Sequence, residues 1–583
     1  MELLQVQTKL QGAYQMAVHG RIKRWHTGIA SLCAAVLCIG LGGCGNSTAA
    51  APSSSGGSRN TNLSKIITAY NTWPVDAITP GKAQGGSSTR ITDLLFAGLV
   101  SNDSSGKWHY DAAVSIEPND DYTQFTVGLR PDMAFSDGTN VTSESFTKAW
   151  SYEANIRHHQ PNAGYLSLIS GYDDLRRGDV ADDAQLSGLN IIDDTTFTIE
   201  LSKPCLTFIS MLAHRAFYPL PQLFYADPSG FEKDPVGNGP YRLWQWDMSG
   251  HPQSMTLIPH LNYHSVNSAR NDGIRFIFYS DSRKAYKDLQ DGKLDVLDAI
   301  PGSKYKTFAS DKNAIAVNGS GSCIQMLMVS QDYSHFGFDD EGLLRRQAIS
   351  RALKRTSLIS DTMPNLALPA TDFLSPGIAA YTDSLSGGEV FTYSKAQARA
   401  LWAKADSIRP WGSYDAIRIS YDAQADNKAL YDSIARQLKD VLGVKVELAA
   451  VPSTGEFYGK IKRREISGFA GITWSPSFLT PWEYLKPLYS TDSANADGSF
   501  NLSGYADDDF TAMLSKALTA ATASSSSILY QSAEETLLQQ LPGIPLMYKN
   551  SFGVSSATTS GFSLNSNGVP RYYQIRRDRR YLL

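Results

Sequence analysis

Apolar and polar positions along this chain follow two different periods. Every second residue is apolar at 125–129 and again at 196–201, which predicts two half-buried β-strands. A later stretch combines both periods, with alternation at 417–421, apolar residues four apart at 430–442, and alternation once more at 444–448. This order predicts a β-α-β unit, in which the two strands are parallel and joined by a right-handed crossover. The pattern therefore indicates a mixed α/β fold.

Two further helices are predicted near the C-terminus, at 507–518 and 529–541. The stretch between them, residues 520–527, is low in complexity, and we expect a surface loop or a weak helix end there. The chain has 583 residues, which is enough for roughly two to four lobes and a large core. No internal repeat is visible in the sequence.

The N-terminal region has the pattern of an export signal. Three basic residues within 21–24 precede an apolar run at 29–41, which is too short to span a bilayer comfortably. The run is followed by Gly-Gly and Cys44, an arrangement that resembles the bacterial lipobox and implies lipidation of Cys44. A cleaved secretory signal with an incidental cysteine is the alternative. Residues 46–62 are rich in Ser, Gly and Ala, as expected for a flexible tether.

Composition and charge are those of a globular protein with a mildly acidic surface. Hydrophobic residues make up 42% and charged residues 19% of the chain, and the net charge is −4. Removal of residues 1–43 would take away four basic residues and one acidic residue, leaving a net charge of −7. The body has no basic stripe, so nucleic acid is not an expected partner. Translation from Met1 and translation from Met16 both fit this sequence.

The body of the chain lacks the common catalytic and metal-binding motifs. We find no phosphate loop, HExxH pair, nucleophile elbow or dinucleotide fingerprint, and no CxxC spacing. His260 and His264 are four residues apart, but Pro259 breaks a helical interpretation, so a loop with two exposed histidines is expected. Cys205 and Cys323 are the only cysteines beyond Cys44, and they could pair. The sequence thus predicts no catalytic residue, no metal and no cofactor.

Six blocks of the sequence resemble blocks of family 5 of the bacterial extracellular solute-binding proteins, the oligopeptide- and dipeptide-binding type. The strongest is GLRPDMAFSDGTNVT at 128–142, which is similar to the family's LRkgvkFsDGtpvTA. The other blocks are LFAGLV (95–100), PVGNGPY (235–241), LQDGKLDV (289–296), RQAISRALKR (346–355) and LPGIPLMY (541–548). They follow the family order from about residue 64 to residue 575.

The resemblance implies a three-lobed α/β fold of the type II-like periplasmic binding proteins (cluster C), with a hinge between lobes I and III. The implied organisation is a lipoprotein signal (1–43), the lipidated Cys44 with its linker (44–62), lobe I (62–95, 188–320 and 546–583), lobe II (96–187) and lobe III (321–545). The chain would cross between lobes I and III near residues 321 and 545. Ligand would bind in the cleft and favour the closed state, because only there does it touch both lobes.

Residues 473–485 (TWSPSFLTPWEYL) resemble the family segment that pairs with a peptide backbone by β-augmentation. The implied ligand-binding residues are Gly85, Gly86 and Ser87 of lobe I, and Thr473, Trp474, Ser475, Ser477 and Trp482 of lobe III. For Trp482 and Tyr484 the alternative is a place in the core of lobe III, which is the preferred interpretation for Tyr484. Trp474 is expected in the cleft.

Two positions depart from the family pattern. The aspartate that holds a peptide's α-amino group in family members falls on Ser477, so a charge-assisted bond worth roughly 1.5–3 kcal/mol is missing there. Another carboxylate, such as Glu483, could replace it, or the ligand is not a simple peptide. One partner of a disulfide found in some members falls on Cys323, but the other falls on Ser475. Cys323 is therefore either free or joined to Cys205.

We expect a lipid-anchored binding protein on the outer face of the cytoplasmic membrane, monomeric, which delivers peptide to the permease and ATPase subunits of an ABC importer. An oligosaccharide or another small polar solute is the alternative ligand, since Trp474 and Trp482 could stack on sugar rings. Nickel or haem is a more distant possibility. The rival functions are a surface sensor or adhesin lipoprotein, and a surface hydrolase, which the missing motifs disfavour.

Overall fold

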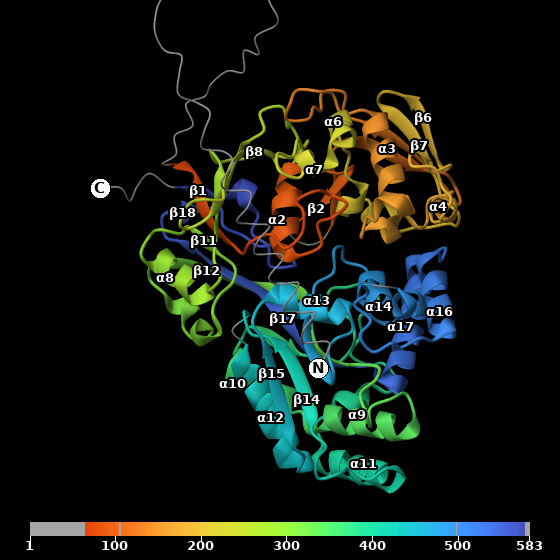
Figure 1. The fold of residues 1–583 in the computed structure, drawn as a ribbon, viewed down its shortest axis with the longest axis vertical. Helices are drawn as coiled ribbons and strands as arrows, with labels where there is room; N and C mark the ends of the chain where they lie inside the picture. The colour runs from red at the N-terminus through yellow and green to blue at the C-terminus, as the bar shows by residue number, and fades with distance from the viewer. Residues whose placement is uncertain (1–64, 104–106, 426, 497, 578–583) are drawn as a thin grey trace, which may run out of the picture. The chain divides into compact units, whose positions relative to one another are not determined.

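One large sheet is assembled from segments that lie far apart in the sequence (Figure 1). We describe it from a computed structural model, in which residues 65–103, 107–425, 427–496 and 498–577 are described. The predicted signal (1–43), Cys44 and the linker (44–62) lie outside the described residues. The strand order is β15 (Val446–Val451), β14 (Ile417–Asp422), β16 (Phe469–Trp474), β12 (Ala314–Val329), β17 (Gly543–Ser556), β11 (Val296–Leu297), β1 (Ile67–Asn71), β10 (Ile274–Phe278), β9 (Ser254–Pro259) and β8 (Tyr241–Asp247).

Two long antiparallel strands, β12 and β17, occupy the middle of this sheet and join its two halves. Their register shifts between Gly319 and Cys323. At Gly321 the strands approach so closely that an added Cβ would lie 2.2 Å from the carbonyl oxygen of Lys549, so only glycine fits. The sequence predicts crossings between lobes I and III near 321 and 545, and both positions lie within these strands.

The predicted β-α-β unit is confirmed. Strands β14 and β15 pair in parallel, and α12 (Lys428–Leu442) connects them and lies beside them in Figure 1. The helix buries Leu430, Ile434 and Leu438, whose four-residue spacing places them on one face. It ends at Gly443, whose φ of 74° is a left-handed cap that glycine adopts without strain.

A second, four-stranded sheet has the order β4 (Ala113–Pro118), β5 (Gln124–Leu129), β7 (Thr196–Glu200) and β6 (Leu189–Asp193). Strands β5 and β7 are the two alternating segments predicted from the sequence. Strand β7 pairs with β5, and β6 pairs with β7, so the sheet that contains β4 and β5 continues beyond residue 187, where the predicted lobe II ends. The sequence blocks cannot reveal which sheet a hairpin joins, because that depends on its hydrogen bonds to a strand elsewhere in the chain. Helix α3 (Ser143–Ala154) packs its buried Trp150 against Phe197 of β7.

The serine-rich stretch at 520–527 is mostly helical. Helix α16 (Asp508–Leu518) agrees with its prediction, but α17 spans Ala523–Gln540 and so begins six residues before the predicted start at 529. The Thr522 side chain accepts from the backbone N–H of Ser525, and Ser525 returns a bond to the backbone of Thr522. This capping box satisfies two backbone N–H groups at the N-terminus of the helix and compensates for the weak helix propensity of serine.

Buried apolar residues form two clusters. One surrounds α12, β12, β14, β16 and β17, and the other surrounds α2 (Gly86–Leu95), α3 and the four-stranded sheet. Helix α8 (Ser282–Gln290), which the sequence assigns to lobe I, contributes Ala285, Tyr286 and Leu289 to the first cluster. The core is thus continuous across the predicted boundary near residue 320. Within the described part of the chain, no helix is long and apolar enough to cross a membrane.

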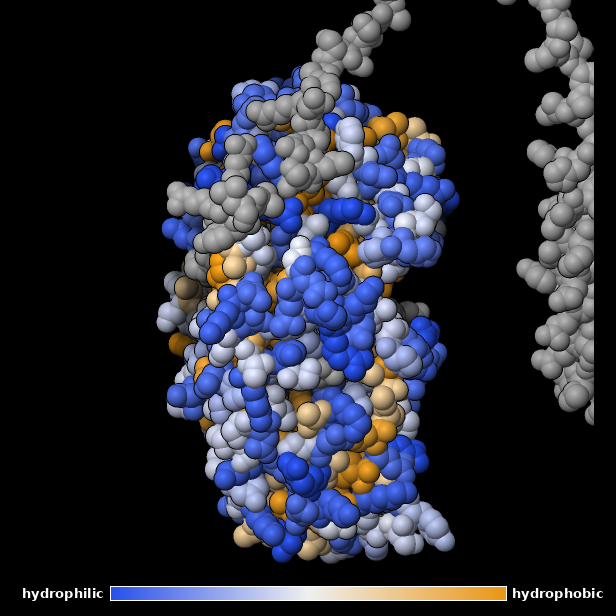
Figure 2. Space-filling view, turned by 90° about the vertical axis from the view of Figure 1, so that its left-hand side faces the viewer, coloured by the Kyte–Doolittle hydropathy of each residue, from blue (hydrophilic) through white to orange (hydrophobic). Residues whose placement is uncertain are grey.

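Figure 2 shows a mainly hydrophilic face, on which apolar side chains gather only in small separate groups. Soluble proteins normally expose scattered apolar residues of this kind. This face therefore shows no broad apolar surface for a partner.

Candidate functional site

Strand β16 extends beyond its parallel neighbour β14. The β14–β16 pairing covers Phe469, Ala470 and Gly471, whereas the pairing with β12 continues to Thr473 and Trp474. Among the described residues, the end of β16 thus has a strand partner on one side only. In open α/β sheets, ligands bind beyond the carboxyl ends of parallel strands. The end of β16 has the position and the free edge that such a site needs.

A buried polar network fixes the backbone at this end of β16. The Thr473 hydroxyl donates to Gln325 Oε1 (2.6 Å), and Gln325 Nε2 donates to the Tyr431 hydroxyl (3.0 Å). The Tyr431 hydroxyl donates in turn to the Gly471 carbonyl (2.9 Å). The Tyr458 hydroxyl, from α13 (Thr454–Lys462), donates to the Thr473 carbonyl (2.9 Å). A fully satisfied network of this kind rigidifies the strand end.

Ser475 and Cys323 face each other across neighbouring strands. Their Oγ and Sγ atoms are 2.9 Å apart, so the two positions that form a disulfide in some family members are adjacent here. Both Cys323 and Cys205 are free, which excludes the Cys205–Cys323 pair that the sequence left open. Burial raises the pKa of the Cys323 thiol, which keeps it neutral.

Trp474 projects to the opposite face from Thr473 and Ser475, since side chains alternate along a strand. Its indole N–H donates to the Glu483 carbonyl (2.7 Å), and its ring packs edge-on against Phe500, with 5.3 Å between the ring centroids. The ring is half-buried. Trp474 therefore anchors the chain that follows β16, and this structural role does not depend on a ligand.

Ser477 and Glu483 lie together where that chain turns into α14 (Pro481–Tyr489). The Glu483 carboxylate accepts from the backbone N–H of Ser477 (3.0 Å) and from the Tyr165 hydroxyl of lobe II (3.2 Å). Glu483 is 2% exposed, and burial raises its pKa to about 7. Arg215, the nearby cation acting on it, is already paired with Asp93 (3.1 Å). A carboxyl group thus stands beside Ser477, without a described ion-pair partner.

Two aromatic rings from outside residues 321–545 pack against the same segment. Phe478 packs edge-on against Tyr165 (6.1 Å) and His214 (6.4 Å), and those two rings stack at 3.6 Å. Burial lowers the pKa of His214 well below its usual value, so the ring is neutral. Trp482 packs against both apolar clusters, and the Lys486 ammonium lies 4.6 Å from its ring centroid. The alternative that placed Trp482 in the core agrees with these contacts.

Gly85, Gly86 and Ser87 lie at the start of α2. The Gly85 N–H donates to Asp76 Oδ2 (2.5 Å), and the Ser87 carbonyl accepts from Asn71 Nδ2 (3.0 Å). An added Cβ at Gly86 would meet no atom within 4 Å. The turn approaches lobe III through its neighbour Gln84, whose Oε1 accepts from Lys462 Nζ (2.5 Å). Residues 473–483 lie together, whereas the described hydrogen bond from the 85–87 turn toward this region is the one between Gln84 and Lys462 of α13.

Other polar residues surround the site, and the sequence patterns did not identify them. Asp422 ends β14, where its Oδ2 accepts from the Thr454 hydroxyl (2.6 Å). Lys549 lies on β17 opposite Cys323, and Tyr458 and Tyr165 supply the hydroxyls described above. The position of Asp422, directly after the first strand of the β-α-β unit, was the available signal.

His260, predicted as exposed, is 6% exposed, and its Nδ1 bonds the Gly239 carbonyl (3.0 Å).

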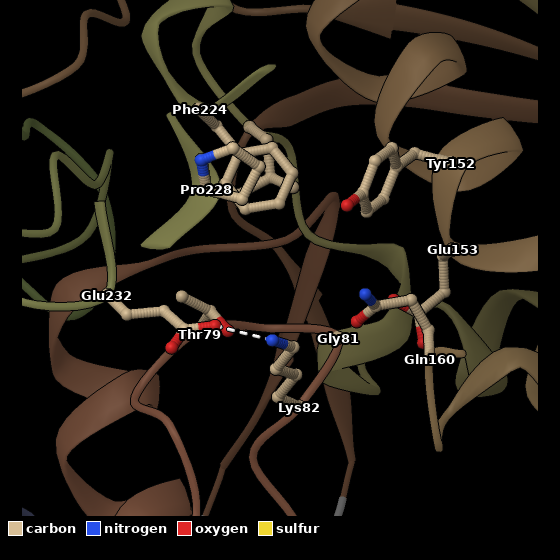
Figure 3. Close-up of a pocket in the computed structure, with 10 residues that line it drawn as sticks. Thr79, Gly81, Lys82, Tyr152, Glu153, Gln160, Phe224, Pro228 and Glu232 are labelled. Carbon is tan, nitrogen blue, oxygen red and sulfur yellow. Dashed lines mark hydrogen bonds and ion pairs between the residues drawn. The ribbon is translucent and has the colours of Figure 1, made fainter. Parts of the chain in front are cut away.

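A small cavity of about 20 Å³ lies elsewhere, between the turn at Thr79–Lys82 and α3 (Figure 3). Glu153 and Gln160 line one side of it, and Lys82, paired with Glu232 at 2.6 Å, lines the other. Burial raises the pKa of Glu153 to about 8, so this carboxyl is neutral at pH 7. A cavity of this size accommodates about one water molecule, which is too little for a solute. We therefore place the candidate site at the end of β16.

Comparison with known families decides the assignment. Residues 107–496 match the profile of the bacterial extracellular solute-binding proteins, family 5. The chain belongs to this family. Members bind solutes outside the cell rather than transforming them, which gives this chain a binding role.

Relatives of known function and structure lie within the same family. The dipeptide-binding protein DppE of Bacillus subtilis is 24% identical over 76% of this chain and 79% of its own length. The glutathione-binding protein GsiB of Escherichia coli strain K12 is 25% identical over 83% of this chain and 89% of its own. The murein tripeptide binding protein MppA of Escherichia coli superposes with a TM-score of 0.75, at 20% identity, over 88% of this chain and 98% of its own. The family fold predicted from the sequence, a type II-like periplasmic binding protein, is confirmed.

Proposed function

We propose that this protein captures short peptides outside the cell and delivers them to the permease of an ABC importer. The observation that carries the proposal is the end of β16, whose backbone beyond Gly471 lacks a strand partner on the β14 side among the described residues. An extended peptide can add to such an edge, and its main-chain hydrogen bonds give affinity without reading side chains. The relatives that bind a dipeptide, glutathione and a murein tripeptide support a peptide as the ligand class.

Glu483 is the group that we propose for the peptide amine. Its carboxyl lies against the backbone of Ser477, the position at which family members carry the amine-binding aspartate. The carboxyl is buried without a described ion pair, and an ammonium arriving there would stabilise its charged form. Glu483 would thus restore the charge that serine lacks.

The Glu483–Tyr165 bond also suggests how binding and closure are linked. It joins the first turn of α14 to Tyr165 of the predicted lobe II, and the Phe478 ring packs edge-on against the stacked Tyr165 and His214 rings at the same place. A ligand that contacts both sides favours the closed arrangement, because the open one offers it fewer contacts. We further propose that the protein works as a monomer, held at the outer face of the membrane by a lipid on Cys44.

An oligosaccharide is the second ligand class that the sequence suggested. It depended on Trp474 and Trp482 as stacking rings, but Trp474 packs on Phe500 and Trp482 packs between the two cores. Neither ring is an open platform in this arrangement. The structure therefore favours a peptide over a sugar.

Calorimetric titration with trialanine and its N-acetylated form tests this proposal. We expect wild-type protein to bind trialanine at least tenfold more tightly than the acetylated peptide, because a buried ion pair with Glu483 is lost on acetylation. Glu483→Gln should abolish the difference, whereas Glu465→Gln, which removes an exposed carboxylate paired with Arg463, should preserve it. Absence of binding to either peptide by the wild-type protein would contradict the peptide proposal.

A further inference from the structure

Lys549 is placed at the middle of the long strand β17, beside the candidate site. It lies directly opposite Cys323 of β12, and Cys323 faces Ser475 at 2.9 Å. Cross-strand partners project from the same face of a sheet, so the side chains of Lys549, Cys323 and Ser475 share one face. This is the face from which Thr473 and Ser475 project, next to the edge proposed for the ligand backbone.

The Lys549 ammonium has no hydrogen bond or ion pair within the described residues. The side chain is half-buried, and burial lowers its pKa, while the Cys323 thiol and Asp422 act in the opposite direction. Neither of these groups makes a hydrogen bond or an ion pair with the Lys549 ammonium. The thiol is neutral, and both Asp422 oxygens are engaged, Oδ1 by the Gln424 N–H (2.9 Å) and Oδ2 by the Thr454 hydroxyl (2.6 Å).

A desolvated cation without a partner is costly, and proteins keep one mainly where a partner arrives from outside. Most other basic side chains around the site already have partners. Lys462 bonds to Gln84, and Arg90 forms a buried pair with Asp298. Lys549 therefore differs from these neighbours, because its ammonium has no hydrogen-bond or ion-pair partner among the described residues and its side chain shares a face of the sheet with Cys323.

We propose that Lys549 selects ligands that carry a carboxylate, and that it binds this carboxylate when the peptide adds to the end of β16. The inference rests on the proposed peptide-binding function and adds a charge requirement to it. Glu483 lies beside Ser477, and Lys549 lies opposite Cys323, the residue that faces Ser475, so opposite charges lie near the same short segment. A peptide lying along 473–477 would present its amine to Glu483 and a carboxylate to Lys549.

The carboxylate has two possible sources, an acidic side chain or the peptide C-terminus. Three Glu tripeptides (Glu-Ala-Ala, Ala-Glu-Ala and Ala-Ala-Glu), titrated against their Gln counterparts, report on the side chain and its position. Trialanine titrated against its C-terminal amide reports on the terminus. We expect at least one pair to differ tenfold or more in Kd with wild-type protein, the carboxylate form being the tighter binder, and the pair that differs identifies the source.

Lys549→Met should reduce that ratio to near one while retaining the affinity for the neutral peptide. Lys549→Arg should keep part of the preference, and Lys428→Met, which removes an exposed cation paired with Asp432, should leave it unchanged. Ligand-free Lys549→Met should also melt at a higher temperature than wild type, because an unpaired half-buried charge has been removed. A merely structural lysine would give a lower melting temperature instead.

Two results would overturn this assignment. If wild-type protein binds neutral and anionic members of every pair equally, Lys549 selects no carboxylate, and peptide binding itself still stands. If the ratio in Lys549→Met equals that of wild type, the selection belongs to another residue. Absence of binding by every peptide would overturn the proposed function together with this inference.

Discussion

At the scale of single residues, the site is organised around charges that lack partners. Glu483 is a buried carboxyl without a described cation, and Lys549 is a half-buried cation without a described anion. Burial shifts each pKa toward the neutral form, which is the expected response of an isolated charge. Both shifts would reverse when a ligand of opposite charge arrives.

Affinity for peptides with a free amine should fall as the pH is lowered through the pKa of Glu483. That pKa is about 7 in the ligand-free protein, and the amine pairs only with the ionised carboxyl. Between pH 7.5 and pH 5.5 we expect a roughly tenfold or greater rise in Kd for trialanine, measured by calorimetry. Glu483→Gln should bind weakly with no such pH dependence. An unchanged wild-type Kd across this range would show that Glu483 does not hold the amine.

Trp474→Ala should weaken peptide binding and leave the fold intact. The indole N–H holds the Glu483 carbonyl, so its loss frees the segment that carries the carboxyl. We expect a stability loss of about 2–4 kcal/mol, since the half-buried ring also packs on Phe500. Denaturant unfolding and calorimetry would measure both effects. Trp244→Ala, at a 52% exposed position, is the control that should change neither, and equal affinity in a folded Trp474→Ala protein would remove Trp474 from the site.

At the scale of elements, the sequence predicted the periodic strands and helices well. It predicted less well where α17 begins and which strands share a sheet. Strands β5, β7 and β14 and helix α12 follow their periods closely because each buries one face. Helix α17 begins earlier than predicted, because its serine-rich first turns depend on the Thr522 cap rather than on apolar spacing. The β6–β7 hairpin joins the sheet of β4 and β5, a strand pairing that the sequence blocks do not reveal.

Some residues at the candidate site could be predicted from the sequence, and others could not. The family resemblance located 473–477 and the facing pair Cys323 and Ser475, because both follow from position along a strand. Lys549 could not be recognised from sequence, since its place at the site comes from strand order, whereas the position of Asp422 after the first strand of the β-α-β unit was a usable signal. Strands β16, β12 and β17 come from distant parts of the chain and must be adjacent before Ser475, Cys323 and Lys549 come together.

Ser475→Cys should form a disulfide with Cys323 on mild oxidation. The Ser475 and Cys323 side-chain atoms already face each other at 2.9 Å across antiparallel strands, a spacing compatible with disulfide geometry. Disulfides typically stabilise a fold by about 2–4 kcal/mol, and we expect a gain in this range. Thiol titration and melting with and without reductant would measure this. Ser477→Cys should not form the bond, and free thiols in oxidised Ser475→Cys would contradict the β12–β16 register.

At the scale of the whole molecule, stability should depend on pH through buried carboxyl groups. Glu534 of α17 and Asp372 are both fully buried, and burial raises the pKa of Asp372 to about 6 and that of Glu534 well above its usual value. A raised pKa means that the folded state binds protons more tightly than the unfolded state. The stabilisation is therefore complete below about pH 4 and is lost as the pH rises through the folded-state values.

We accordingly expect the ligand-free protein to melt at progressively lower temperature as the pH rises from 5 to 8. Glu534→Gln should remove part of this decline, because the amide needs no proton to remain neutral. Glu535→Gln, which alters the adjacent carboxyl that accepts from the Ser386 N–H, is the matched control. A decline of the same size in Glu534→Gln and wild type would show that the buried pair does not control stability.

The central claim is that this family 5 protein binds peptides at the end of β16. Native mass spectrometry of the 45–583 body, before and after exposure to mixed peptides and mixed oligosaccharides, tests it most directly. We expect a monomer that gains the mass of one peptide, with loss of that adduct for N-acetylated peptides and a rise in melting temperature alongside. Adducts with oligosaccharides alone, or no adduct and no change in melting temperature, would contradict the account.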